Sequence, residues 1–163
     1  MDNDLKKQFA MRIPQANNVQ MIMISYEIID AYLQEAKGYQ TGSGDYVLSI
    51  DKAKRCIEEM MNNLHYEYDI AKDLKQLYLY MKKRLRQAIC EKDADAIEEV
   101  RKMINQLHDS YESIADTDNS QPMMQNAQSV VAGMTYGKSK TLDEAPTDID
   151  RQKSLPAMAK TQS

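Results

Sequence analysis

The 163-residue sequence has no tryptophan, one phenylalanine and two cysteines. Two cysteines are too few for the disulfide framework of a small secreted domain. Both Cys56 and Cys90 fall within helical patterns, so we expect small core side chains in a reducing compartment. No run of about 18 apolar residues predicts a membrane span, and residues 1–13 lack the apolar segment of a secretory signal. We therefore expect a cytoplasmic protein that does not insert into membranes.

The sequence also lacks an excess of positive charge, because 21 Lys and Arg face 25 Asp and Glu. This balance predicts no nucleic-acid partner, and we expect the basic run KKRLR at 82–86 to spread over the solvent side of a helix. Residues 132–139, AGMTYGKS, resemble a phosphate-binding loop. Such a loop needs a preceding strand and a following helix, but only two valines precede it and Pro146 would interrupt a helix after it.

Histidine chemistry finds little support in the sequence. Both His65 and His108 have Asn three residues earlier, so the Glu-x-x-His pairs of a di-iron helical bundle are absent. No Ser–His–Asp or Cys–His arrangement indicates a nucleophilic enzyme. We expect no metal, no cofactor and no enzymatic activity, and a helical phosphorelay protein that uses His65 or His108 stays open as an alternative.

Proline and glycine are scarce in the middle of the chain. No proline occurs between residues 15 and 121, and the glycines there fall between residues 38 and 44. The apolar pattern changes phase near Tyr66–Asp69 and near Glu91–Asp93, which predicts two more turns with Asp69 and Asp93 as N-caps. We predict an all-α fold, in which an N-terminal arm (1–16) precedes an antiparallel up-down-up-down four-helix bundle (17–116). Its helices should span about 18–37, 46–66, 70–90 and 94–115.

The C-terminal residues 117–163 are rich in Ser, Thr, Asn, Gln, Asp and Lys, which predicts a flexible tail. One piece differs, because Pro122 suits a first helical turn and Gly133 suits a helix end. We predict a short amphipathic helix there, at about 121–132. Its apolar face comprises Met123, Met124, Ala127, Val130 and Val131.

Two predicted helices carry more apolar side chains than one core face requires. The helix at 18–37 has one stripe of Val19, Ile22, Met23, Tyr26, Ile29 and Leu33 and a second stripe of Met21, Ile24, Ile28 and Tyr32. In the helix at 70–90, Leu79 and Tyr80 lie off the core stripe. Such a helix is either buried on several sides or exposes a partner site. We favour a groove for a partner's helix, and a structural dimer that pairs the second stripe with itself stays open.

Residues 60–85, MMNNLHYEYDIAKDLKQLYLYMKKRL, follow a known family pattern closely. Its specific part is Leu77, Tyr78, Tyr80, Met81, Arg84 and Leu85. Residues 23–27, MISYE, and 93–114, DADAIEEVRKMINQLHDSYESI, extend the match. On these residues the sequence resembles FliS, the flagellar secretion chaperone family, over residues 13–115. It departs at residues 15–18, QANN, where the family often has Thr-Ala-Ser-Pro, at Ile28, where Gly is common, and at Tyr111, where Trp is common.

The resemblance implies a non-enzymatic cytosolic chaperone. Its client would be the C-terminal region of flagellin, which it would keep from premature polymerisation and deliver to the export gate of the flagellar type III apparatus. We expect a monomer or weak homodimer. The candidate client-binding residues are Met21, Ile24, Ile28, Tyr32, Met60, Met61, Tyr78, Leu79 and Tyr80. Candidates for covering the groove are Phe9, Ile13, Met123, Met124, Val130 and Val131.

Overall fold

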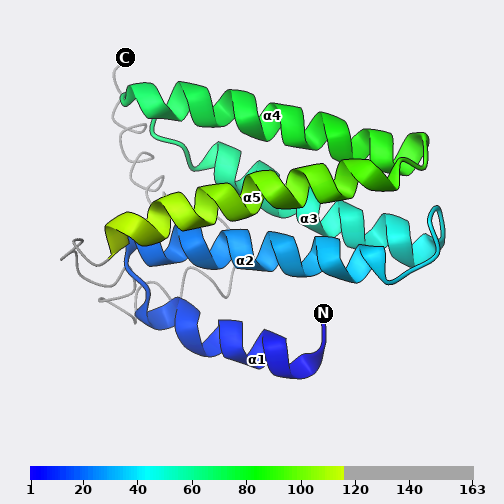
Figure 1. The fold of residues 1–163 in the computed structure, drawn as a ribbon. Helices are drawn as coiled ribbons and strands as arrows, with labels where there is room; N and C mark the ends of the chain where they lie inside the picture. Colours follow the sequence, from blue (N-terminus) through cyan, green and yellow to red (C-terminus); the bar gives the residue numbers. More distant parts are fainter. Residues whose placement is uncertain (116–163) are drawn as a thin grey trace, which may run out of the picture. The chain divides into compact units, whose positions relative to one another are not determined.

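The computed structural model describes residues 1–115, which form five α-helices joined by short connections (Figure 1). The helices are α1 (Asn3–Arg12), α2 (Asn18–Lys37), α3 (Gly44–Asn62), α4 (Asp69–Cys90) and α5 (Ala94–Ala115), with a 3-10 turn at Ile13–Gln15 after α1. No strand occurs in these residues, so the all-α class is confirmed for this part of the chain. None of its helices is long and apolar enough to span a bilayer. The predicted tail helix at 121–132 lies outside the described residues.

The helix ends follow local capping chemistry. Ser43 precedes α3, and its side chain accepts a hydrogen bond from the Tyr46 N–H, so the helix begins two residues earlier than predicted. It also ends earlier, because residues 63–68 form a turn. The prediction that Asp69 is the N-cap of α4 is wrong. Tyr68 takes that position without a side-chain bond, and the negative charge of Asp69 lies in the first helical turn, where the helix dipole favours it.

Two other helix starts are capped by side chains. Asp93 precedes α5 and accepts a hydrogen bond from the Asp95 N–H at 3.1 Å, as predicted for an N-cap. At the start of α2, Asn17 and Gln20 form a reciprocal capping box. The Asn17 side chain accepts from the Gln20 N–H at 2.8 Å, and the Gln20 side chain accepts from the Asn17 N–H at 3.0 Å. Both caps fix where the chain leaves a turn and enters a helix.

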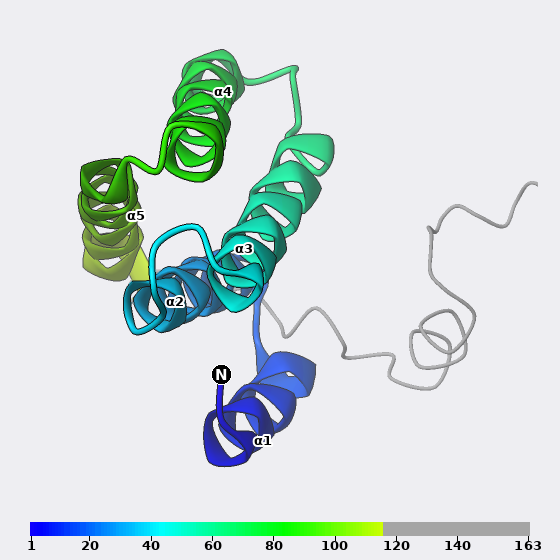
Figure 2. The same cartoon turned by 90° about the vertical axis from the view of Figure 1, so that its right-hand side faces the viewer.

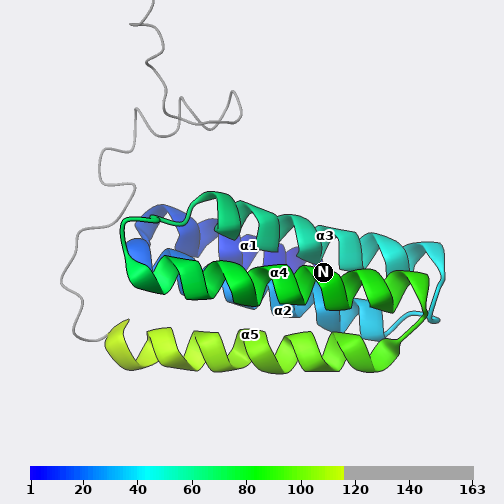
Figure 3. The ribbon, with the colours of Figure 1, turned by 90° about the horizontal axis from the view of Figure 1, so that it is seen from above.

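The four long helices surround one main core. Helix α2 packs against α3 and α5, and α4 packs against the same two helices on the other side (Figure 2). Their long axes run roughly side by side, as the view from above shows (Figure 3). The buried residues that make up this main core are Tyr26, Ile29, Leu33, Ala36, Tyr46, Ile50, Ala53, Ile57, Leu74, Tyr78, Met81, Leu85, Ala88, Ala96, Ile97, Val100 and Ile104.

The two cysteines differ in their surroundings. Cys56 is half-buried and packs against the main core, and burial raises the pKa of its thiol. Cys90 is exposed, so its predicted place in the core is wrong. It is the last residue of α4, where the helix leaves the core for the turn into α5.

Ion pairs join the long helices outside the core. Arg101 of α5 binds Asp30 of α2, with Nε 2.8 Å from Oδ1 and Nη2 3.2 Å from Oδ2. Within the run 82–86, Lys82 pairs with Glu58 of α3, and Arg84 pairs with Glu99 of α5 and with Asp93, which precedes α5. None of the four basic residues of this run is buried: Lys83 and Arg86 are exposed, and Lys82 and Arg84 are partly covered by their acidic partners.

A buried tyrosine pair links α2 to α4 through the main core. The hydroxyls of Tyr26 and Tyr78 are 2.7 Å apart, and the Tyr111 ring lies 5.9 Å from that of Tyr26. Burial raises the pKa of Tyr78 to about 12, and it raises the pKa of Tyr26 further. Both phenols therefore stay neutral, and each satisfies the other's hydrogen-bonding need in the buried interior.

Tyr26→Phe and Tyr78→Phe should each lower the free energy of unfolding by about 1–2 kcal/mol, because each leaves one buried hydroxyl without its partner. The double variant should cost less than the sum, with a coupling of at least about 0.5 kcal/mol. Urea unfolding of the four proteins measures this cycle. Strictly additive losses would show that the two hydroxyls do not act as a pair.

Candidate protein-interaction site

Helix α1 covers the second apolar stripe of α2. Phe9 is 5% exposed and Ile24 is 2% exposed, and these two residues form a small cluster with Ala16. The half-buried side chains around this cluster are Met1, Leu5, Ile13, Met21 and Ile28. Phe9 and Ile13, which the sequence suggested as cover for a groove, therefore lie against Met21, Ile24 and Ile28. The other suggested cover residues, Met123, Met124, Val130 and Val131, lie outside the described residues.

This small cluster is separate from the main core, so α2 is buried on two sides by different elements. Its first stripe, including Tyr26 and Ile29, meets α3, α4 and α5, whereas Ile24 meets α1. Tyr32 does not lie in the same cluster as Ile24, contrary to the prediction. It packs against the edge of the main core, because its position on the helix lies between the two stripes.

The remaining predicted site residues are spread over three places. Met60 and Met61 are half-buried at the edge of the main core, near the end of α3. Tyr78 is fully buried in that core and presents no surface. Leu79 and Tyr80 are exposed at 41% and 42% on the outside of α4. The structure therefore brings Met21, Ile24 and Ile28 together and does not unite all nine residues in one groove.

Tyr80 is held in place by a polar network with α5. Its hydroxyl donates to Glu99, and the same carboxylate accepts from Arg84 Nε at 2.7 Å. These hydrogen bonds, with that from Tyr80 the stronger influence, lower the pKa of Glu99, and the bond to Glu99 raises the pKa of Tyr80. The phenol ring is thus exposed and also oriented. Sequence reasoning missed this network because it depends on a partner in another helix.

One ion pair fastens the end of α1 to α2. The Arg12 guanidinium donates two hydrogen bonds of 2.6 Å to Glu27, and His108 Nε2 of α5 lies 3.6 Å from the same carboxylate. The bond from Arg12 holds the pKa of Glu27 below its ordinary range. Docking of α1 therefore rests on an apolar cluster and a bidentate ion pair. No local sequence pattern indicates this pair, because its partners belong to different elements.

Acidification should loosen α1. The pKa of Glu27 in the folded protein lies below its unfolded value of about 4.3. The Arg12–Glu27 pair therefore stabilises the docking of α1 fully above about pH 4.3, and this stabilisation is lost as the pH falls through the folded-state pKa of Glu27. Amide exchange in α1, compared with α5 at pH 6 and pH 3, measures the effect. Glu27→Gln should raise α1 exchange at pH 6 and weaken its pH dependence, and an unchanged pH dependence would refute the role of this carboxylate.

The structure offers no metal centre within residues 1–115, where no group of three metal-binding side chains occurs. His65 is exposed in the turn after α3, beside Glu67 at 3.4 Å. His108 lies on α5 beside Glu27. His65 therefore does not lie on a helix, and His108 is partly buried next to a carboxylate.

Comparison with known families decides the relationship of the chain. The family model of the flagellar protein FliS matches residues 1–118, a span that includes all five helices. The chain belongs to the FliS family. FliS proteins are flagellar export chaperones and not an enzyme family. No curated protein matches the chain.

The residues that carry the FliS resemblance divide between core and surface. Tyr78, Met81 and Leu85 are buried in the main core, whereas Tyr80 and Leu77 are exposed on the flank of α4. One pattern thus serves both the packing of α4 and the surface that it presents.

The departures from the FliS pattern also have structural places. Ile28, where Gly is common, belongs to the cluster under α1 and adds apolar contact there. Tyr111, where Trp is common, places its ring against the buried Tyr26. Tyr111 therefore keeps an aromatic contact in the core. Ile28 enlarges the apolar surface of α2 that α1 covers.

Proposed function

We propose that α2–α5 form an antiparallel up-down-up-down four-helix bundle that acts in the cytosol as an export chaperone for the C-terminal region of flagellin. It would keep this region from polymerising early and deliver it to the gate of the flagellar type III export apparatus. The single observation that supports this proposal most is the stripe Met21, Ile24 and Ile28 on α2. It lies outside the main core and is covered by a short N-terminal helix.

The proposed mechanism exchanges one helix for another. A client helix with an apolar face has the same character as α1, which with the turn after it presents Leu5, Phe9 and Ile13 to α2. The client would replace α1 on the stripe and bury its own apolar residues, which are those that drive its self-assembly. Because a disordered client must order itself on binding, part of the interaction free energy is lost and the complex stays releasable.

The exposed side of α4 supports a second contact area. Leu79 and Tyr80 are large and exposed, and the Glu99–Arg84 network orients the Tyr80 ring. Oriented aromatic side chains make strong contacts in interfaces, because little conformational entropy is lost on binding. An extended client segment could therefore contact both the α2 stripe and this flank.

Calorimetric titration with a peptide of the flagellin C-terminal region tests the proposal. We expect saturable one-to-one binding with a negative heat-capacity change, which reports the burial of apolar surface. A scrambled peptide of the same composition is the matched control. Absence of binding to the folded protein, or equal binding of the scrambled peptide, would refute it.

The two alternatives from the sequence have less support. Phosphorelay requires a histidine that accepts a phosphoryl group, yet His65 lies in a turn and His108 lies beside the Glu27 carboxylate. A dimer that pairs the second stripe with itself would have to displace α1 from both copies, since α1 covers that stripe. Sedimentation at micromolar and millimolar concentration distinguishes a dimer from a monomer.

A further inference from the structure

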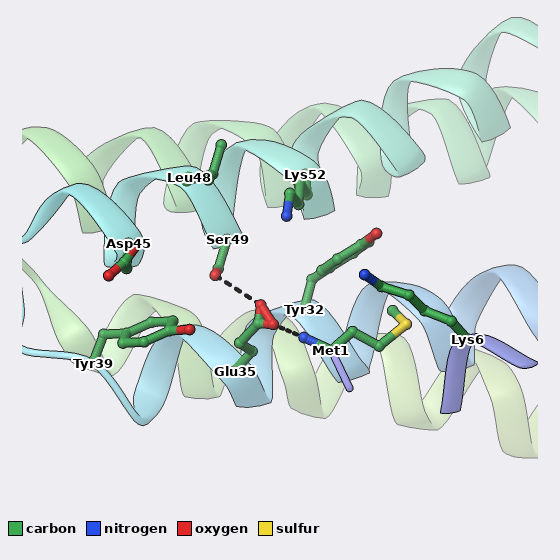
Figure 4. Close-up of a pocket in the computed structure, with 9 residues that line it drawn as sticks. All are labelled: Met1, Lys6, Tyr32, Glu35, Tyr39, Asp45, Leu48, Ser49 and Lys52. Atoms are coloured by element: carbon green, nitrogen blue, oxygen red, sulfur yellow. Dashed lines mark hydrogen bonds and ion pairs between the residues drawn. The ribbon is translucent and has the colours of Figure 1, made fainter. Parts of the chain in front are cut away.

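A cavity of about 270 Å³ lies between α1, α2 and α3 (Figure 4). Phe9 and Ile24 do not line it, whereas Met1 belongs both to its lining and to the cluster under α1. Its lining is mostly polar, with a few large side chains at the rim. The lining residues are Met1 and Lys6 from the N-terminal segment, Tyr32, Glu35 and Tyr39 from α2 and its end, and Asp45, Leu48, Ser49 and Lys52 from α3.

The carboxylate inside this cavity already has its partners. Ser49 Oγ donates to Glu35 Oε1 at 3.2 Å, and the ammonium group of Met1 forms an ion pair with Glu35 Oε2 (Figure 4). Glu35 is therefore compensated and does not serve as the counter-ion of the lysines. The other acid, Asp45, lies beside Tyr39, at the end of the cavity away from Lys6 (Figure 4).

Two lysines at the opposite end lack such partners. Lys6 reaches from α1 and Lys52 stands on α3, on the two sides of the Tyr32 ring (Figure 4). Within residues 1–115 neither ammonium group has a carboxylate at ion-pair distance, and Lys52 Nζ lies 5.5 Å from the Tyr32 ring centroid. Lys7, the neighbour of Lys6, differs because it pairs with Asp4. The cavity thus has a positive end that is not neutralised from inside.

The rim beside this positive end carries an apolar side chain. Leu48 is exposed, lines the cavity and lies one helical turn before Lys52 on α3. A large exposed apolar side chain next to unpaired cations matches an acidic residue that has an apolar neighbour. The position of Asp45 at the far end disfavours an anion there, so the charges also specify a direction for the ligand.

We propose that this cavity binds an acidic peptide segment of a partner protein, with a carboxylate between Lys6 and Lys52 and an adjacent apolar side chain against Leu48. Because Lys6 belongs to α1 and Lys52 to α3, the bound carboxylate ties α1 to the helices of the main core. The partner therefore holds α1 in its docked position. This inference does not depend on which client the α2 stripe receives.

Coupling follows from this geometry. A ligand that binds only when α1 is docked shifts the protein toward the docked state. It therefore lowers the affinity for any ligand that displaces α1, and that second ligand lowers the affinity for the first by the same factor. The cavity is thus a second site whose occupancy opposes exposure of Met21, Ile24 and Ile28.

NMR titration of the full chain with the probe acetyl-Glu-Leu-amide tests the site. We expect saturable shifts at Tyr32, Ser49 and Leu48, and slower amide exchange throughout α1. The neutral probe acetyl-Gln-Leu-amide should bind more weakly. Lys6→Gln and Lys52→Gln should each weaken binding of the acidic probe by about twofold to fivefold, as expected for a partly exposed ion pair.

Lys7→Gln is the matched control, because Lys7 is on the same helix, is 77% exposed and pairs with Asp4. It should leave the affinity unchanged. Equal binding of the two probes, or an equal loss in the Lys7 variant, would overturn the site. Inorganic phosphate that binds as well as the acidic probe at equal ionic strength would overturn the assignment to a peptide, and unchanged α1 exchange would overturn the clamping of α1.

Discussion

Ile24→Asp is expected to weaken binding of the flagellin C-terminal region by at least about 30-fold, as for the loss of a central interface side chain, while the main core stays folded. Ile24 is buried by α1 and not by the core helices. A carboxylate at this position would lose its hydration whenever the apolar face of α1 or of a client covered it. Helix α1 can move away and leave the charge in water, so the substitution weakens the docking of α1 and does not unfold the main core.

Ile29→Asp is the control for this prediction, because Ile29 is one of the fully buried residues of the main core. A charge there has no route to water and should unfold the protein. Far-UV circular dichroism with urea unfolding separates the two variants, and calorimetric titration measures client affinity. If Ile24→Asp unfolds the protein as Ile29→Asp does, the second stripe is a structural part of the core and not a binding site.

Phe9→Ala should tighten client binding. Truncation of a buried Phe side chain costs about 3 kcal/mol or more of stabilising free energy. The buried contacts of Phe9 are those that dock α1 on α2, so the loss falls on docking. Because a covered site binds with an affinity reduced by the fraction of open protein, weaker docking raises the apparent affinity. A docking cost of about 3 kcal/mol corresponds to a gain in client affinity of at most about 150-fold, and the gain is smaller if α1 already opens often.

Met11→Ala is the matched control on the same helix, since Met11 is 70% exposed and makes little contact with α2. It should leave both affinity and stability nearly unchanged. Titration of the same flagellin peptide into the wild type and both variants makes the comparison. Equal or weaker binding by Phe9→Ala would show that α1 does not compete with the client and that it builds part of the client's site.

The four long helices were predictable because their apolar stripes are strong, because glycines mark the first connection, and because the phase of the apolar pattern changes near the other two. Helix α1 was not, since a ten-residue helix gains most of its stability from tertiary contact. A signal was present: Asp2 can cap the helix, and Leu5, Phe9 and Ile13 repeat every four residues. Reading residues 1–16 as an arm overlooked this periodicity.

The site was predictable in part. The sequence showed that α2 has two apolar stripes, but stripes of similar character do not tell which of them faces the core. The tertiary structure decides this, through contacts such as the Tyr26–Tyr78 hydrogen bond. Tyr32 was assigned to the wrong neighbours because it lies between the stripes, and ion pairs such as Arg12–Glu27 join elements whose pairing no local pattern reveals.

The capping box at the start of α2 determines how α1 can leave. Both of its hydrogen bonds join Asn17 and Gln20, so neither requires α1 to be docked. When α1 separates, α2 therefore keeps its first turn, and the change in direction falls on the connection between the two helices, at the residues beside Pro14, whose own φ is fixed. Helix α1 would swing as a hinged lid, and opening would cost only the contacts of the lid itself, with no unwinding of the helix beneath it.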